Sequence, residues 1–379
     1  MEVRPVESPF YLRFGVTMIT IAILAAALHL GRAIFVPIFF AILLATLLLP
    51  IVQFLQRKRL GKILSIAVTL SVAVLLITII LYFLSTQIGN FLDDIPALQK
   101  RSRELLWQGQ KWVNDHLNIG FKAQKEYIDD TADKMNSPDI LGRTFLSITA
   151  AISYILFLPI YTFLILYHKD MIKKFLITMF KDGNQEKVRE VLVESKLMSQ
   201  QYITGLLIEL CIVFLLNSVG FLLLGIKYPI FLGLVAALLN IVPYIGMIVA
   251  NIICIIITIM STINPINALW VAAVLIGVQL IDNNILMPLI VGNKVKLNAI
   301  AIIVGVLVAG ALAGIAAMFL AIPGLALLKI IFERVEHLHP WAMLLGDETT
   351  IEEEQKNPVR RAFYRVRKKS AEKKKPTVR

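Results

Sequence analysis

The sequence predicts an all-α polytopic membrane protein with six to eight transmembrane helices. Hydrophobic residues make up 58% of the chain and charged residues only 17%. Several apolar runs approach or exceed the ~20 residues that a helix needs to cross the hydrocarbon core of a bilayer. A transmembrane β-barrel would instead show short segments in which polar and apolar residues alternate. Cys211 and Cys254 both lie inside apolar runs, so we expect buried thiols and no disulfide.

Residues 1–89 are predicted to hold three membrane helices. The apolar runs place them at Tyr11–Leu30, Ala33–Leu55 and Ile63–Ile88. The first run is followed at once by the second and lacks a convincing small-residue cleavage site, which indicates a retained helix and not a signal peptide. The basic loop Arg57-Lys58-Arg59 joins the second and third helices. By the positive-inside rule this loop is cytoplasmic, and the N-terminus is then cytoplasmic as well.

Residues 90–142 are predicted to form a small helical insert on the extracytoplasmic side. The segment mixes acidic and basic residues, and apolar residues such as Ile95, Leu98 and Leu105 recur at helical spacing. This pattern is typical of amphipathic helices outside the membrane. Their apolar faces need cover, which the membrane interface, the rest of the protein or a neighbouring subunit could provide.

Residues 143–200 are predicted to return the chain to the cytoplasm. A fourth membrane helix is expected over Phe145–Tyr167. The residues that follow are basic, which fits the cytoplasmic side. Met171–Met198 then has the pattern of a short helical hairpin, broken at Asp182-Gly183-Asn184.

Residues 201–335 are predicted to be a transport core with broken helices. A fifth helix ends near Gly225, and a helix over Asn267–Val291 separates two apolar runs, Tyr228–Thr262 and Asn298–Glu333. A continuous helix of ~35 residues would be about 50 Å long, well beyond the ~30 Å hydrocarbon core. The chain must therefore bend, and the residues expected at the hairpin breaks are Pro229, Pro243, Gly246, Pro288, Gly310, Gly314 and Pro323.

Each long run follows a helix with an intramembrane carboxylate, so the two halves of this core look alike. Each run is either one tilted, kinked crossing or a re-entrant hairpin that enters and leaves on the same side. Re-entrant hairpins place Lys294 and Lys296 in the cytoplasm, which suits the positive-inside rule better. The two halves then have opposite orientations, as in the inverted repeats of secondary transporters. The charged tail, residues 336–379, is cytoplasmic under both arrangements, and we expect it to be disordered near anionic lipid.

Polar side chains inside the apolar runs are the candidate site. A charged Asp at mid-helix costs at least ~2.5–3.5 kcal/mol, so Asp282 needs a partner, a cavity, a cation or a proton; it could otherwise cap or pack a helix near the interface. Glu209 could carry a proton, or form an inter-helix hydrogen bond in its protonated form. The amides could bind a polyhydroxylated ligand or sodium, or hold helices together. The candidate solute- and ion-binding residues are Asp282, Asn283, Asn284, Glu209, Asn240 and Gln279.

Missing motifs argue against other classes of function. The sequence has no GxxxxGK[ST] phosphate loop and no HExxH zinc motif, so we expect no bound ATP, catalytic metal, other cofactor or enzymatic activity. The net charge of +12 is concentrated in loops and the tail, whereas nucleic-acid binding needs a basic folded surface. A coupled secondary transporter for a small polar solute or a cation remains, and a non-transporting scaffold for envelope complexes is the alternative of another class.

Several motifs of the second half resemble those of the autoinducer-2 exporter family of bacterial inner-membrane proteins. The motifs are Tyr202-Ile203-Thr204-Gly205, Tyr228-Pro229-Ile230-Phe231-Leu232-Gly233, Asn240-Ile241-Val242-Pro243-Tyr244-Ile245-Gly246, Asp282-Asn283-Asn284-Ile285-Leu286-Met287-Pro288 and the stretch from Gly310 to Gly314. The resemblance implies transport of autoinducer-2, or sodium (or lithium)/proton antiport as in other members. It also implies a homo-oligomer in the inner membrane, with a pentamer as the expected size. Ala317 departs from the family, which more often has a glycine there.

Overall fold

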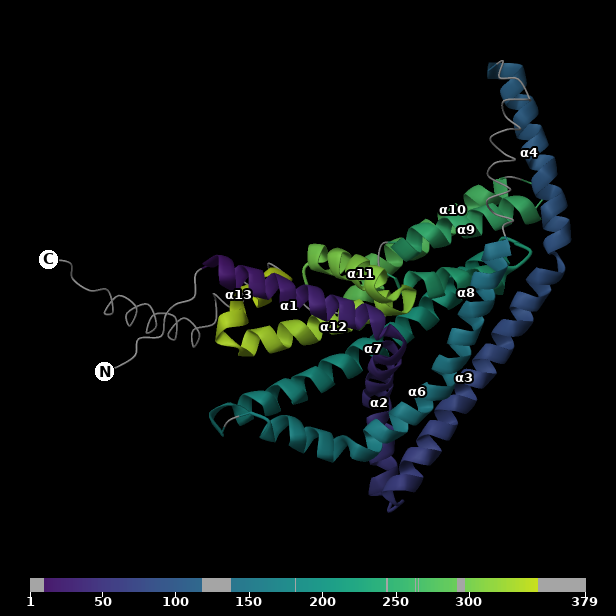
Figure 1. The fold of residues 1–379 in the computed structure, drawn as a ribbon. Coiled ribbons are helices and arrows are strands. Elements are labelled where there is room, and N and C mark those ends of the chain that lie inside the picture. The colour runs from purple at the N-terminus through teal and green to yellow at the C-terminus, as the bar shows by residue number, and fades with distance from the viewer. Residues whose placement is uncertain are drawn as a thin grey trace. The chain divides into compact units, whose positions relative to one another are not determined.

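The computed structural model describes residues 10–117, 138–180, 182–242, 245–262, 264, 266–291 and 297–346 (Figure 1). The contacts within the chain divide it into two compact units. Unit 1 draws on Met1–Arg32, Ile172–Tyr202 and Val291–Arg379, and unit 2 on Ala33–Met171 and Ile203–Ile290. The helices of unit 1 are α1 (Phe10–Leu30), η1 (Asp182–Asn184), α11 (Ala299–Ala313), α12 (Ile315–Arg334), η4 (Glu336–Leu338) and α13 (His339–Leu345). Those of unit 2 are α2 (Arg32–Arg57), α3 (Lys62–Asp93), α4 (Ile95–Leu117), α8 (Pro229–Asn240), α9 (Ile245–Ser261), α10 (Ile266–Ile281) and the π-helix η2 (Asp282–Val291). Two longer helices, α6 (Pro138–Thr178) and α7 (Gln185–Leu223), contribute to both units.

In the residues that the structure describes, the regular elements are all helices, which confirms the predicted all-α class. Within the described part, five helical segments are long and apolar enough to cross a bilayer: α2, α3, α7, α12 and the α10–η2 segment (Ile266–Ile290). Shorter apolar helices accompany them, namely α8, α9, α11 and most of α1. Large apolar side chains such as Leu30 and Leu223 are more than four-fifths exposed, as expected of surfaces that face hydrocarbon. The chain is therefore a multi-pass membrane protein.

α6 and α7 are longer than the sequence predicts. The fourth membrane helix was expected to end at Tyr167, but α6 continues to Thr178. The predicted cytoplasmic hairpin does break at η1, yet its second arm and the fifth membrane helix form one helix of 39 residues. Lys, Glu, Gln and Leu are good helix formers. Hydropathy therefore marks where such a helix leaves the bilayer and not where the helix ends.

α8 and α9 form an antiparallel helical hairpin in unit 2. Near its turn, Gly246 of α9 lies directly against the carbonyl of Leu239 in α8. Farther from the turn, the Cys254 thiol lies 3.6 Å from the carbonyl oxygen of Leu232. From the first contact to the second, the position in α9 rises from Gly246 to Cys254 while the position in α8 falls from Leu239 to Leu232, so the arms run in opposite directions. Pro229 begins α8 and does not break a helix, while Pro243 lies outside the described residues.

α11 and α12 form a second antiparallel hairpin, in unit 1. Gly310 lies against Met318 and Gly305 against Leu325, and Gly314 joins the two arms with a φ of +80°. The predicted break near Gly314 is thus present. A further break was expected at Pro323, but α12 runs through it; proline is tolerated in membrane helices because neighbouring groups satisfy the freed backbone.

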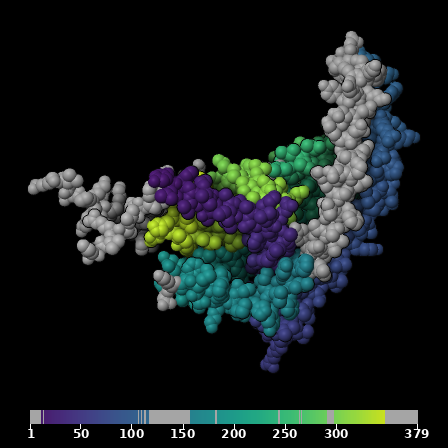
Figure 2. Space-filling model, in the orientation of Figure 1, coloured from purple at the N-terminus to yellow at the C-terminus, as the bar shows by residue number. Residues whose placement is uncertain are grey.

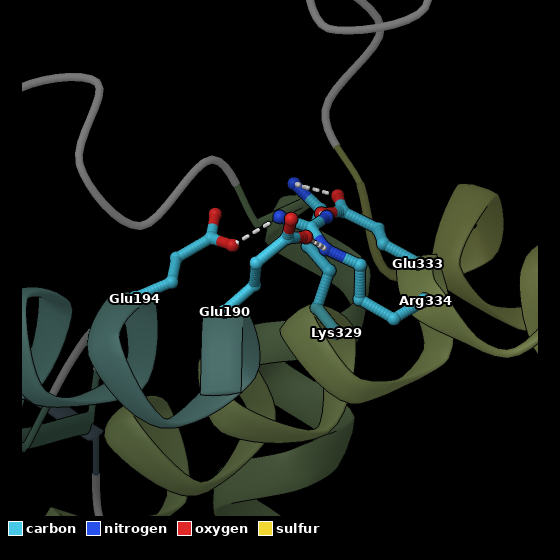
Figure 3. A network of polar contacts seen from close by, with 5 residues as sticks. All are labelled: Glu190, Glu194, Lys329, Glu333 and Arg334. Carbon is cyan, nitrogen blue, oxygen red and sulfur yellow. Dashed lines mark hydrogen bonds and ion pairs between the residues drawn. The ribbon is translucent and has the colours of Figure 1, made fainter. Parts of the chain in front are cut away.

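Two contacts fix the second hairpin within unit 1. At its turn, His29 Nδ1 of α1 lies 2.7 Å from the carbonyl oxygen of Leu312, which is one of the carbonyls that the end of α11 leaves without a helical partner. Figure 2 shows α1 (purple) along this part of the surface. At the opposite end, Arg334 of α12 reaches two acidic residues of α7, with Arg334 Nη2 to Glu194 Oε2 at 2.6 Å and Arg334 Nε to Glu190 Oε2 at 3.5 Å (Figure 3).

In unit 2 the start of α8 is fastened to the bend between α3 and α4. We call the five residues involved the Asp94 clasp: Phe91, Asp94, Lys227, Tyr228 and Phe231. Lys227 Nζ lies 2.8 Å from Asp94 Oδ2, and the Tyr228 hydroxyl donates to the same oxygen at 2.5 Å. The Phe91 ring stacks on Phe231 with the centroids 4.5 Å apart. α4 also packs against α9, so part of the predicted amphipathic insert is covered by the protein itself; residues 118–137 lie outside the described residues.

The Asp94 clasp predicts a pH-dependent stability. The Lys227 ammonium first, and then the Tyr228 hydroxyl, lower the pKa of Asp94 below its ordinary value. A carboxyl whose pKa is lower in the folded state stabilises the fold above its unfolded pKa, and this contribution is lost as pH falls through the folded pKa. We expect the thermal midpoint in detergent to fall more steeply on acidification in wild type than in Asp94→Asn. Asp93→Asn, at the exposed neighbour, should follow wild type; equal slopes for wild type and Asp94→Asn would contradict the prediction.

Candidate functional site

A small cavity lies among α7, α8, α9 and α10, next to the main apolar core of unit 2. The core consists of Phe221, Ile226, Tyr228, Leu232, Ala236, Ala250, Cys254, Val271 and Leu275. The cavity is lined by Val213, Asn217, Ala236, Asn240, Met247, Ala250, Asn251, Leu275, Val278, Gln279 and Asp282. It leaves the centres of water-sized molecules about 20 Å³, more than the ~10–15 Å³ that one water requires. One carboxyl and four amides therefore share a space fit for a single small ligand.

Asp282 and Asn240 form the polar centre of this cavity. Asn240 is the last residue of α8, at the turn of the hairpin, and its Nδ2 donates to Asp282 Oδ2 at 3.0 Å. Asp282 is only 3% exposed, and its Oδ1 has no hydrogen-bond partner among the described residues. A buried carboxyl oxygen without a partner is costly in hydrocarbon. This oxygen is therefore the atom of the site that most needs a ligand or a proton.

A change of helix type places Asp282 at the cavity. α10 ends at Ile281, and the π-helix η2 starts at Asp282. Pro288 lies within η2; a proline has no N–H and its ring clashes with the carbonyl four residues earlier, so it disturbs the regular α-helical pattern. π-Helical turns occur frequently at functional sites. Pro288 thus changes the winding of the helix without ending it.

Glu209 lies near Asp282 without lining the cavity. It belongs to α7, is 5% exposed, and its Oε2 has no partner in the described part of the chain. Glu209 and Asp282 both belong to unit 2, and their carboxyls are close enough to interact electrostatically. A carboxyl inside a membrane is costly unless it holds a proton, a cation or a polar partner, and this applies to Glu209 as it does to Asp282.

The structure separates the other predicted site residues into two groups. Gln279 lines the cavity, and its Nε2 donates to Asn283 Oδ1 at 3.0 Å. Asn283 itself is exposed, and so is Asn284, whose Nδ2 donates to the Leu280 carbonyl at 2.8 Å. Asp282, Asn240 and Gln279 are therefore brought together at the cavity, whereas Asn283 and Asn284 are exposed and do not line it.

Asn217 and Asn251 line the cavity but were not among the predicted site residues. Asn217 is 2% exposed; its Nδ2 donates to the Val213 carbonyl at 2.9 Å, and its Oδ1 lacks a partner among the described residues. The signal was present in the sequence, because Glu209, Val213 and Asn217 follow one another at spacings of four and share one face of a helix. Asn251 follows Met247, another lining residue, at the same spacing.

Comparisons with known proteins agree with this membrane architecture. The model of the AI-2E family transporter matches residues 18–337. The putative transport protein YrrI of Bacillus subtilis is 26% identical over 317 residues, which is 79% of this chain and 86% of that protein. The AI-2 transport protein TqsA of Escherichia coli is 23% identical over 363 residues, 91% of this chain and 98% of TqsA. A family match over most of the chain, together with helices suited to crossing a membrane, shows that the protein belongs to the AI-2E family of membrane transporters.

Proposed function

We propose that the protein is a secondary transporter that exports a small polar solute of the autoinducer-2 kind, driven by a proton or sodium gradient. The observation that carries this proposal is a carboxyl oxygen of Asp282 that is buried next to Asn240 at the tip of the α8/α9 hairpin and has no hydrogen-bond partner among the described residues. The similarity of the chain to TqsA, an AI-2 transport protein, supports the class of solute.

The physical argument starts from the cost of an unpaired acid in a membrane. Asp282 is stable there when it holds a proton or a cation, and each exchange of that ion changes the charge at the hairpin tip. Broken helices that meet near the midplane are the binding elements of secondary transporters. If the α8/α9 and α11/α12 hairpins are re-entrant with opposite orientations, alternating access can follow from the movement of one hairpin.

Sodium (or lithium)/proton antiport is the second candidate function. The size of the cavity favours it, since the space suits one ion better than a solute of several heavy atoms. Glu209 would supply a second buried carboxyl, on α7, that could carry a proton. A non-transporting scaffold for envelope complexes is the alternative of another class, and it would leave the burial of Asp282 and Glu209 without a function.

The proposed orientation in the membrane follows from the charge pattern, and the proposed oligomeric state follows from the family. The basic loop Arg57-Lys58-Arg59 between α2 and α3 would face the cytoplasm of a bacterial cell, as would both termini. α4 would then lie on the extracytoplasmic side. A homo-oligomer, with the pentamer as the expected size, would bury part of the apolar surface that the single chain exposes.

The test compares wild type with Asp282→Asn in proteoliposomes. A proton or a sodium gradient is imposed in turn, while internal pH and the movement of labelled autoinducer-2 are followed. We expect gradient-dependent flux in wild type and its loss in Asp282→Asn, because the amide keeps the shape of the side chain but cannot release a proton or balance a cation.

Asn284→Ala is the matched control, since Asn284 is an exposed amide two residues away. It should retain flux. Equal flux in wild type and Asp282→Asn would reduce Asp282 to a structural acid. An absence of gradient-driven flux of any tested solute or ion in wild type would favour the scaffold.

A further inference from the structure

We propose that the cavity binds one dehydrated monovalent cation and that Asn217, on α7, is a ligand of this ion together with Asp282. The site would then be the coupling-ion site and would be separate from the solute site. The coupling role rests on the proposed transport function, whereas binding of the ion does not.

The orientation of the amides makes the cavity a site of acceptors. A carbonyl oxygen only accepts hydrogen bonds, so the contact between Asn217 and the Val213 carbonyl must use the Asn217 NH₂ group. The NH₂ groups of Asn240 and Gln279 each donate one hydrogen bond as well, to Asp282 and to Asn283. Asn217 therefore keeps its side-chain oxygen for a ligand, and this oxygen has no hydrogen-bond partner among the described residues.

Two oxygens carry most of the argument. Asp282 Oδ1 and Asn217 Oδ1 both belong to side chains that are at least 97% buried, and neither has a partner in the described part of the chain. They come from different helices, α10–η2 and α7, and both residues line the cavity. Buried acceptors without donors each cost free energy, and a cation coordinated by both oxygens removes the two deficits at once. Carboxylate and carbonyl oxygens are the ligands that hard cations prefer.

Charge and size select a monovalent ion. Asp282 is the one carboxyl among the residues that line the cavity, and a single negative charge balances one positive charge. A divalent ion would leave an uncompensated charge in a low-dielectric site, which is unfavourable. The space suits one water-sized ligand, so a solute with several heavy atoms must bind elsewhere or wait for the cavity to widen.

The test measures equilibrium binding of radioactive sodium to the purified full-length protein in detergent, with lithium, potassium and calcium as competitors. Wild type should bind one sodium per chain, and lithium should compete better than calcium. Asn217→Leu keeps the side-chain volume and removes the ligand oxygen. Loss of groups outside the first coordination shell already weakens metal binding about 10–100-fold, so removing a ligand should weaken sodium binding at least ~10-fold.

Asn284→Leu is the control, because it removes an exposed amide that does not reach the cavity. It should bind sodium like wild type, and size-exclusion profiles and thermal midpoints would check that both variants fold. Asn217→Asp tests the charge argument separately: a second carboxyl should turn the preference from sodium toward calcium.

The possible outcomes separate this inference from the proposed function. Sodium binding that is absent in wild type, or equal in wild type and Asn217→Leu, would overturn the ion site even if proteoliposomes export a solute. Sodium binding that Asn217→Leu weakens would support the site even if the transport assay fails. A wild type in which calcium displaces sodium more readily than lithium does would also overturn the assignment.

Discussion

Replacing Gly246 by alanine is expected to open the tip of the α8/α9 hairpin and to abolish transport. A Cβ atom on Gly246 would overlap the carbonyl oxygen of Leu239 and lie 2.6 Å from its carbonyl carbon. The obstructing atoms belong to the backbone, so no side-chain rotation can make room. The two arms must separate near their turn, where Gly246 allows them to approach most closely.

Separation of the two arms would displace residues of the polar site. Leu239 precedes Asn240, and a shift of this backbone moves the amide that donates to Asp282. Overpacking usually costs about 1–3 kcal/mol, and the short contact with the backbone places Gly246→Ala at or above the top of this range. We expect a lower thermal midpoint in detergent and no gradient-driven flux in proteoliposomes.

Gly277→Ala provides the matched control in the same unit. Gly277 lies within α10, and its added Cβ would meet no atom of the described residues within 4 Å. Alanine is favoured over glycine in a helix by about 0.5–1 kcal/mol, so this variant should be as stable as wild type or slightly more stable. A Gly246→Ala protein with the midpoint and flux of Gly277→Ala would show that the hairpin tip tolerates a wider turn.

The hairpins illustrate how far length and composition predict a membrane fold. A run too long for one crossing requires a bend, and Gly314 is where the second bend occurs. The sequence could not show that Gly246 is required for close approach of two backbones, because that contact joins residues on different helices. Pro323 was predicted to break a helix, but α12 continues through it. A proline breaks a membrane helix only where no neighbouring group satisfies the freed backbone.

The polar site was predictable in its residues and not in its pairing. Asp282 and Asn240 stand out as polar side chains in apolar runs, but 42 positions separate them, and only the fold brings the end of α8 to the start of η2 and makes them partners. Asn283 and Asn284 are equally conspicuous in the sequence, yet they are exposed and do not line the cavity. Asn217 was not among the predicted site residues; a single amide in an apolar helix is equally consistent with a residue that holds helices together.

Gly314→Ala is expected to destabilise the second hairpin for a reason different from that at Gly246. No described atom lies within 4 Å of the position that its Cβ would take, so space is available. The backbone is at φ +80° and ψ −168°, close to a region that essentially only glycine occupies, and other residues there cost about 1–3 kcal/mol. The thermal midpoint should fall, while Gly324→Ala, in the interior of α12 with open space around it, should keep the midpoint of wild type.

Asparagine substitutions distinguish the backbone strain at Gly314 from that at Gly225. Gly225, after α7, has a φ of +65° and a hydrogen-bond pattern in which Ile226 N–H reaches the Phe221 carbonyl and Gly225 N–H the Leu222 carbonyl. This is the Schellman ending, with a left-handed residue that asparagine adopts more readily than alanine. Gly225→Asn should therefore be more stable than Gly225→Ala. At Gly314 the value of ψ lies outside the left-handed helical region, so asparagine should bring no such recovery; a rescue there by asparagine would mean that the turn of the hairpin can relax into an ordinary left-handed bend.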